Sequence, residues 1–271
     1  MHPGRAFATR QSLAIDLRKL GVAAEQQILL HASLRSLGWV DGGAAAVVGA
    51  LRDVLGPAGT VVVPAMTPHN SDTSRQYQQR TRNMTWWQRR QYRRGMLPFD
   101  PATTPGSGNG QIAECVRTSK DAVRSAHPQS SFAAIGANRE RIIRDHAPDC
   151  HFGDRSPLAR LYETGAQILL LGVGYEACTA FHLAEYRYMT YPPRCRYTCV
   201  VLRNERRKWW RYEDVVLDDS DFAVIGEKLA TMDIVRTGTV GAADSALIPL
   251  SAAVDFASAW LAAHRSGDSQ R

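Results

Sequence analysis

The sequence predicts an α/β protein built as a single domain around a sheet that contains parallel strands. An apolar segment at 27–30, a helix over about 43–55 and a second apolar segment at 59–63 follow one another, which is the order of a parallel crossover unit. With 271 residues, of which 44% are hydrophobic and 22% charged, the chain can bury one large core. No internal repeat or linker divides the sequence, so we expect one domain over residues 1–271.

Local signals predict further elements in the first two thirds of the chain. Leucines at helical spacing, closed by Gly21, predict a helix over 10–20. Ser156 before Pro157 predicts the N-cap and the first residue of a short helix. The apolar segment 167–171, which follows this helix, predicts a further buried strand next to a glycine turn.

The last third of the chain predicts a hairpin and a closing helix. Segments 197–202 and 208–212 are predicted to form the two strands of the hairpin, and residues 203–207 its charged tip. Ser251 is the expected N-cap of the closing helix. The apolar face of this helix is expected to consist of Ala253, Phe256, Ala257 and Trp260. We expect residues 265–271 to form a disordered tail.

The stretch from about 64 to 110 is rich in proline, glycine and asparagine and is expected to be an irregular active-site loop. Its segment from Arg75 to Arg94 holds seven arginines interleaved with tryptophan and tyrosine. The simplest interpretation is a solvated insertion with some stacked aromatic rings. The alternative, a nucleic-acid-binding protein, is disfavoured because no nucleic-acid module accompanies the segment.

Composition also limits which partners and which cellular compartment are expected. The formal net charge of +7 and the pI near 9.4 favour an anionic partner without identifying it. The longest apolar run, Ile168 to Val173, is far shorter than the roughly 20 residues of a membrane-spanning helix. Five scattered cysteines fit reduced thiols better than a disulfide framework. We therefore expect a cytoplasmic protein that binds neither nucleic acid nor membrane.

Three histidines stand beside small or hydroxyl residues near expected strand ends: His31, His127 and His182. His182 differs from the others because Glu185, three residues later, would share its face of a helix. A carboxylate bonded to one ring nitrogen fixes the tautomer and raises the basicity of the other, which suits proton removal from an amine. Cys178 offers an alternative, a covalent nucleophile activated by this imidazole. Cysteine and histidine spacings match no common zinc pattern, so no metal is expected.

Several sequence blocks, in order along most of the chain, resemble the aminoglycoside 3-N-acetyltransferases. The blocks are His31–Gly38, Arg124–Gly136, Gly153–Leu158, Leu169–Gly174 and Thr179–Arg187. The similarity looks closest to the actinomycete self-resistance branch, because Phe99–Pro101 and Asp218–Phe222 also match that branch. The chain departs from many relatives at Asn109, where they carry methionine, and at Asp154, where they carry glutamate. Both positions bear on the fit of the substrate.

The resemblance implies a central mixed sheet flanked by helices, distinct from the common GNAT acetyltransferase fold. It also implies acetyl-CoA as co-substrate and acetylation of the 3-amino group of the 2-deoxystreptamine ring of aminoglycosides, which confers resistance. His182 and Glu185 match the family's catalytic histidine and glutamate. The residues that the resemblance places at the coenzyme are His31, Ala32, Ser33, Leu34, Arg35, Ser107, His127 and Ser130.

A polycationic antibiotic needs local negative charge that overrides the positive net charge of the protein. The residues expected around the antibiotic are Asp72, Asp100, Glu185, Tyr186 and Glu213. The expected chemistry is direct transfer, in which the amine attacks the thioester while His182 accepts its proton. An acceptor amine of another class, such as a peptide or nucleotide antibiotic, stays open. The choice between monomer and homodimer also stays open.

Overall fold

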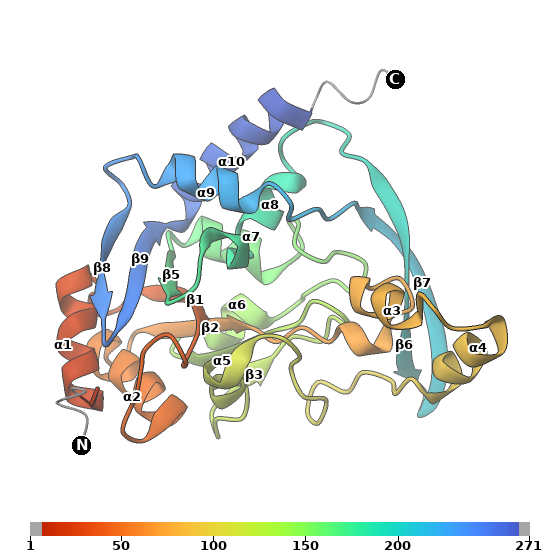
Figure 1. Cartoon of the computed structure of the whole chain (residues 1–271), viewed down its shortest axis with the longest axis horizontal. Helices are drawn as coiled ribbons and strands as arrows, with labels where there is room; N and C mark the ends of the chain where they lie inside the picture. Colours follow the sequence, from red (N-terminus) through yellow and green to blue (C-terminus); the bar gives the residue numbers. More distant parts are fainter. Residues whose placement is uncertain (1–6, 266–271) are drawn as a thin grey trace.

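The computed structural model describes residues 7–265 and contains one mixed sheet of seven strands flanked by helices (Figure 1). The strands are β1 (Gln27–Ala32), β2 (Thr60–Pro64), β3 (Val123–Arg124), β4 (Phe132–Gly136), β5 (Gln167–Leu171), β8 (Arg236–Val240) and β9 (Ala243–Pro249). Their order is β3-β4-β2-β1-β5-β9-β8. Strand β1 pairs in parallel with β2 and β5, as the crossover order predicts, and the outer pairs are antiparallel. The predicted α/β class with a mixed central sheet is confirmed.

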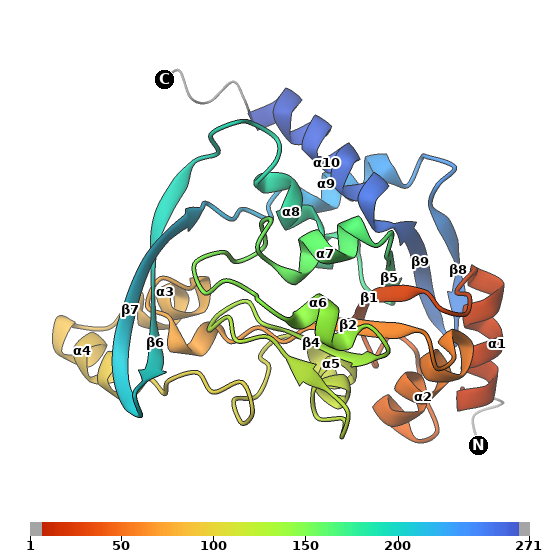
Figure 2. The same cartoon turned by 180° about the vertical axis from the view of Figure 1, so that it is seen from behind.

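Helices cover both faces of the sheet and create two apolar cores (Figure 2). The helices against the first core are α1 (Arg10–Leu20), α2 (Gly43–Leu55) and α5 (Gly110–Arg117). Those against the second are α6 (Arg139–Ile143), α7 (Pro157–Glu163), α8 (Phe181–Glu185), α9 (Phe222–Leu229) and α10 (Leu250–Arg265). Successive side chains of a strand point to opposite faces. Accordingly Leu169 and Leu171 of β5 join the first core, whereas Ile168 and Leu170 join the second.

Local sequence signals located several of these elements correctly. Helices α1 and α2 and strand β5 have the predicted bounds. At the start of α7 the Ser156 hydroxyl accepts a hydrogen bond from the Leu158 N–H at 3.2 Å, as expected of an N-cap. These signals succeed because periodicity and capping depend on neighbouring residues only.

The C-terminal helix begins earlier than predicted. Helix α10 starts at Leu250, so Ser251 lies inside the first turn and is not the N-cap. The predicted apolar face does pack on the second core, through Ala253, Phe256, Ala257 and Trp260. Arg265 is the last residue of this helix, and the rest of the expected tail, 266–271, lies outside the described residues. None of the helices among residues 7–265 is long and apolar enough to cross a membrane.

The stretch 64–110 is not one irregular loop, which corrects the prediction. It contains three helical elements, η1 (Pro68–Asn70), α3 (Arg75–Thr81) and α4 (Trp86–Gly95). The hydroxyl groups of Ser74 and Thr85 cap α3 and α4 by accepting hydrogen bonds from backbone N–H groups. Helix α4 buries none of its residues, so its sequence lacks the apolar periodicity by which a helix is recognised.

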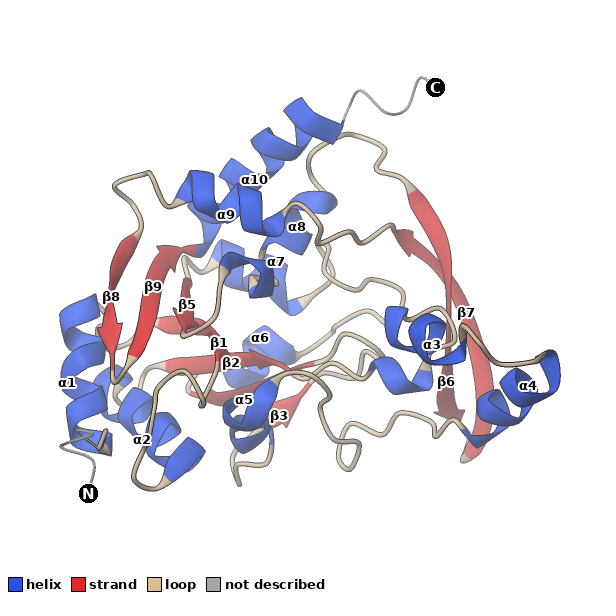
Figure 3. Cartoon of the chain, viewed as in Figure 1, coloured by secondary structure: helices blue, strands red, loops and turns tan. Residues whose placement is uncertain are grey.

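A hairpin of β6 (Arg194–Arg203) and β7 (Arg206–Val215) lies beside α3 and α4 (Figure 3). The predicted hairpin is confirmed, but its strands are longer, because the turn consists only of Asn204 and Glu205, both with positive φ. The Arg207 guanidinium donates to two backbone carbonyl groups at the end of α4. We call residues 68–96 and the hairpin 194–215 together the insertion lobe.

A buried polar cluster joins the insertion lobe to the sheet. The His151 ring meets two residues of β7: its Nδ1 lies 2.7 Å from Asp214 Oδ2, and its Nε2 lies 2.9 Å from the Tyr212 hydroxyl. His127 lies against both His146 and His151, with ring centroids 4.7 and 4.8 Å apart. Burial lowers the pKa of all three imidazoles, to about 4 for His146. The folded protein therefore keeps these rings neutral at pH 7.

Mild acid should destabilise this fold. Below about pH 6.5 the unfolded chain binds protons at these histidines, whereas folded His146 resists protonation down to about pH 4. The contribution of these histidines to the free energy of unfolding is therefore complete above pH 6.5 and decreases as the pH drops towards 4. His146 alone accounts for a loss of about 3 kcal/mol. Urea unfolding across this range measures the slope. His146→Gln should flatten it and the exposed-site control His264→Gln should not; a slope of zero for the unmodified chain would contradict the neutral cluster.

Candidate active site

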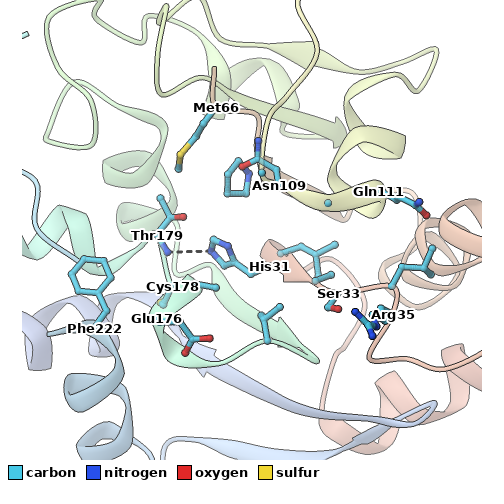
Figure 4. A pocket seen from close by; sticks show the side chains of 18 of the residues that line it. His31, Ser33, Arg35, Met66, Asn109, Gln111, Glu176, Cys178, Thr179 and Phe222 are labelled. Carbon is cyan, nitrogen blue, oxygen red and sulfur yellow. Dashed lines mark hydrogen bonds between the residues drawn. The ribbon is translucent and has the colours of Figure 1, made fainter. Parts of the chain in front are cut away.

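A cavity of about 870 Å³ lies where the central parallel strands end (Figure 4). Its wall includes the end of β1, the turn at 33–35, the loop at 108–111 that leads into α5, and the segment 176–179 beyond β5. Carboxyl ends of parallel strands meet at one edge of a sheet, which explains why distant segments converge here. In Figure 4, Ser33 and Arg35 lie at one end of the cavity and Phe222 at the other. The predicted catalytic residue His182 also lines this cavity.

The structure brings His182 and Glu185 together on α8. Nδ1 of His182 lies 2.6 Å from Oε2 of Glu185, as the spacing of three residues predicts. The imidazole stacks on Phe152, with ring centroids 4.7 Å apart and planes within 7°, and meets Phe222 edge to face. With Nδ1 committed to the carboxylate and the ring held by two aromatic side chains, Nε2 is the nitrogen left to exchange a proton.

Glu185 is completely buried and is fixed through both carboxylate oxygens. While Oε2 bonds His182, Oε1 accepts from the Asp218 backbone N–H at 2.8 Å and from the Arg265 guanidinium at 2.9 Å. The same guanidinium donates to Asp221 Oδ2 at 2.7 Å. A buried carboxylate with this many charge-assisted bonds has one orientation available to it, so it can hold the imidazole in a single tautomer.

His31 belongs to the cavity wall as a neutral ring. Its Nε2 accepts a hydrogen bond from the Thr179 backbone N–H at 3.3 Å, drawn as a dashed line in Figure 4. Burial is the main cause that lowers the pKa of His31 to about 4, with a smaller contribution from nearby His182. His31 therefore joins the strand end to the segment after β5 and carries no charge at pH 7.

Most of the turn predicted to lie beside the coenzyme does line the cavity, namely His31, Ala32, Ser33, Leu34 and Arg35. Within residues 7–265 the backbone N–H groups of Leu34 and Arg35 donate to no protein acceptor, so they are available to a ligand. Ser107 is not on the wall. Its hydroxyl lies 2.6 Å from His69 Nε2, and its backbone N–H donates to the carbonyl of Met66.

His127 and Ser130, also predicted at the coenzyme, lie away from the cavity. His127 has no exposed surface, and its Nδ1 accepts hydrogen bonds from the N–H groups of Gln129 and Ser130. Its ring is packed in the buried polar cluster that holds the insertion lobe. In this structure the histidine stabilises a turn and the fold, and a role of this pair at the coenzyme stays a prediction.

None of the predicted antibiotic-binding residues lines the cavity: Glu185 is buried behind His182, and the other four lie elsewhere. These four residues are Asp72, Asp100, Tyr186 and Glu213. Asp72 is bound by Arg93 at 2.8 Å and by the Thr198 hydroxyl, both in the insertion lobe. The Tyr186 hydroxyl donates to Asp214 at 2.7 Å inside the buried polar cluster.

Asp100 and Glu213 are likewise engaged elsewhere. Asp100 Oδ1 accepts a hydrogen bond from the Ala102 N–H at 2.8 Å, and such local bonds lower its pKa. Glu213 lies on the outer part of β7, 4.0 Å from Arg196. Both side chains act in surface turns and strands, which a sequence pattern alone does not distinguish from a pocket.

The cavity contains functional groups that the sequence analysis did not assign to it. Its carboxylates are Glu176 and Asp219, and Thr179 and Asn109 add polar groups. Glu176 and Thr179 belong to the segment that follows β5, and their place beyond a parallel strand is the signal that could have identified them. Asp219 and Phe222 reach the wall from a segment that is remote in sequence from the other wall segments, so no local pattern identifies Asp219.

Cys178 lies on the wall but is fully buried, and burial raises the pKa of its thiol to about 12. The thiol is therefore protonated at pH 7, and a protonated thiol is a poor nucleophile. Within the described part of the chain, no three histidine, cysteine or acidic side chains gather as a metal site requires.

Comparison with known proteins shows to which family the chain is similar. The family model described as aminoglycoside 3-N-acetyltransferase matches residues 29–262. The aminoglycoside N(3)-acetyltransferase VII of Streptomyces paromomycinus is 36% identical, over 93% of this chain and 91% of its own. The aminoglycoside N(3')-acetyltransferase-like protein YokD of Bacillus subtilis is 35% identical, over 93% and 92%. The Streptomyces relative and the Bacillus relative are almost equally identical to this chain. Membership of the actinomycete branch therefore stays a prediction.

Solved structures show the same fold. The crystal structure of YokD superposes with a TM-score of 0.89 at 32% identity and covers 97% of this chain and 96% of its own. AAC-IIIb, solved as a binary complex with CoASH, gives a TM-score of 0.82 at 31% identity, over 94% and 97%. On the family model, the relatives and the shared fold, this chain belongs to the aminoglycoside 3-N-acetyltransferase family of acyltransferases.

Proposed function

We propose that this protein transfers the acetyl group of acetyl-CoA to the 3-amino group of the 2-deoxystreptamine ring of an aminoglycoside, with His182 as general base and resistance as the result. The observation that carries the proposal is the His182–Glu185 pair at the wall of the 870 Å³ cavity. Acetyl-CoA is the co-substrate of the family, and a structural neighbour binds CoASH. We place the reaction in the cytoplasm, in keeping with five cysteines that form no disulfide.

The turn after β1 is the proposed place for the reacting thioester. Leu34 and Arg35 line the cavity, and within residues 7–265 their N–H groups have no protein acceptor; paired backbone donors can stabilise the oxyanion that develops when a carbonyl is attacked. The Arg35 guanidinium, at the same end of the cavity, offers a positive charge to the phosphates of the coenzyme. Only the first role accelerates the transfer step itself, because the oxyanion forms during the reaction, whereas the phosphates are bound equally before and during it.

His182 would accept the proton of the attacking amine at Nε2 while Glu185 holds Nδ1. Three features support this assignment: the 2.6 Å bond to a fully buried carboxylate, the aromatic rings that fix the imidazole, and its place on the cavity wall. A base positioned in this way contributes about 100- to 10,000-fold to the rate. Direct transfer is favoured over a covalent acetyl-enzyme because the one thiol on the wall, Cys178, is protonated at pH 7.

The substitution His182→Ala should remove the base and leave coenzyme binding intact. We expect the rate of acetyl transfer to fall about 100- to 10,000-fold, since proton removal from the amine would depend on water. Thiol release from acetyl-CoA in the presence of an aminoglycoside measures the rate, mass spectrometry and NMR of the product locate the acetyl group, and calorimetry measures coenzyme affinity. Activity within threefold of the unmodified enzyme would exclude His182 as the base.

Cys178→Ser should keep most of the acetyl transfer activity. The side chain has no exposed surface, so the exchange costs some packing but removes no reacting group in a direct mechanism. Rates and intact-protein mass spectra of the variant, taken with acetyl-CoA alone, provide the test. An inactive variant, together with an acetylated unmodified enzyme, would replace the direct mechanism by a covalent one.

Arg265 acts as a positioning residue, because it touches Glu185 and not the cavity. Arg265→Met removes the guanidinium that holds Glu185 Oε1, so the carboxylate no longer has a single orientation in which to hold the His182 ring.

We therefore expect Arg265→Met to lower kcat about tenfold and to leave KM for acetyl-CoA unchanged. Arg10→Met, which breaks an exposed pair with Asp53 on the other core, is the matched control and should change neither kcat nor KM. A kcat that falls only in proportion to the fraction of folded protein, measured by circular dichroism, would mean that Arg265 only stabilises the fold.

A second acceptor class is favoured by one observation, the positive net charge of +7, which repels polycations at long range. An N-acetyltransferase of this fold that acts on a peptide or nucleotide antibiotic is the resulting alternative. A panel of amines in the thiol-release assay separates the two, because only an aminoglycoside acetyltransferase will prefer the 2-deoxystreptamine compounds.

A further inference from the structure

The acidic segment 218–221 forms the cavity wall at the end opposite the coenzyme turn. Asp219 and Phe222 both line the cavity, and Figure 4 shows Phe222 far from Ser33 and Arg35. The Asp218 backbone N–H holds Glu185, so this segment also adjoins the proposed base. A second substrate that reaches His182 from this end must pass the Asp219 carboxylate.

Asp219 already has a cationic partner, an arginine from the insertion lobe. Arg75, the first residue of α3, donates to Asp219 Oδ1 and lies 3.4 Å from Asp218 Oδ1. The other cavity carboxylate, Glu176, has no cationic partner within residues 7–265. With Arg35 on the wall and Arg75 on Asp219, two guanidinium groups balance the two carboxylates of the cavity.

The distribution of charge over the whole chain also places positive charge near this end of the cavity. Segments 73–99 and 203–211 of the insertion lobe and its flanks carry twelve arginine or lysine residues and one glutamate. The rest of the chain has 21 basic and 25 acidic residues, so its net charge is −4 and all the positive excess belongs to these two segments. They adjoin each other where Arg207 bonds the end of α4, and Arg75 is the point at which they reach the cavity wall.

We propose that Arg75 is a specificity-determining residue that masks Asp219 and biases the enzyme towards acceptor amines with few positive charges. This inference rests on the proposed function, whose acceptor class it narrows. Each additional ammonium group of an acceptor must displace Arg75 or approach it, and like charges in a partly enclosed site repel one another. The pair is exposed, at 60% for the Arg75 side chain and 45% for Asp219, so a ligand can break it at small cost. Arg75 therefore sets a preference and does not close the site.

The test compares Arg75→Gln with a matched control on the same lobe. Arg90→Gln removes the same charge from α4, where the guanidinium lies over Trp86 and, within residues 7–265, pairs with no carboxylate. The acceptors are 2-deoxystreptamine, the shared diamine ring, and sisomicin, which carries additional amino groups. Dissociation constants from calorimetry report binding without turnover, and KM for acetyl-CoA reports the other end of the cavity.

We expect Arg75→Gln to tighten sisomicin binding about 3- to 10-fold, to change 2-deoxystreptamine binding less than twofold, and to leave KM for acetyl-CoA unchanged. Arg90→Gln should change sisomicin binding less than twofold. In the double variant Arg75→Gln with Asp219→Asn the gain should disappear, because the carboxylate that was unmasked is gone.

Equal gains in Arg75→Gln and Arg90→Gln would overturn the proposal in favour of a general effect of lobe charge. A gain that survives in the double variant, or weaker sisomicin binding in Arg75→Gln, would also overturn it. Failure of the proposed function is a separate result: an enzyme that binds these compounds but releases no thiol with any of them loses the proposed activity, while the ratio of dissociation constants still decides the role of Arg75.

Discussion

The arrangement of the site depends on one buried charge, the carboxylate of Glu185. A carboxylate without exposed surface is tolerated only where hydrogen bonds and opposite charge replace its hydration. Here the partners come from three parts of the chain: His182 on the same helix, the backbone before α9, and Arg265 at the end of α10. The same bonds that make burial possible also leave the imidazole a single orientation. One set of contacts thus both stabilises the fold and orients the proposed base.

The fold was predictable wherever neighbouring residues carry the information. Helices α1 and α2 and strand β5 have apolar residues at the spacing of their own secondary structure, because one face of each is buried. Helices α3 and α4 were not predicted, because neither has such a buried apolar face. With almost nothing buried, they are defined by caps at Ser74 and Thr85 and by contacts with a hairpin more than 100 residues away.

The site was predictable in part. His182 and Glu185 are three residues apart, so their contact is a local matter, and the turn after β1 follows from the topology of parallel strands. His127 stood in an equally suggestive sequence context but is packed in the core. Sequence patterns do not separate these cases, because exposure to a cavity is decided by which distant segments cover a residue. For the same reason Asp219 and Arg265 were missed: each reaches the site from a loop or helix end that no spacing relates to residue 182.

The partners of Glu185 also fix when the site can be completed during synthesis. A ribosome makes the chain from its N-terminus, so the strands that form the cavity edge and the helix that carries His182 emerge well before residue 265. Until α10 has left the ribosome, Glu185 lacks its guanidinium partner and the second core lacks its last helix. A nascent chain can therefore contain every residue that lines the cavity while the orientation of the His182 imidazole is not yet fixed.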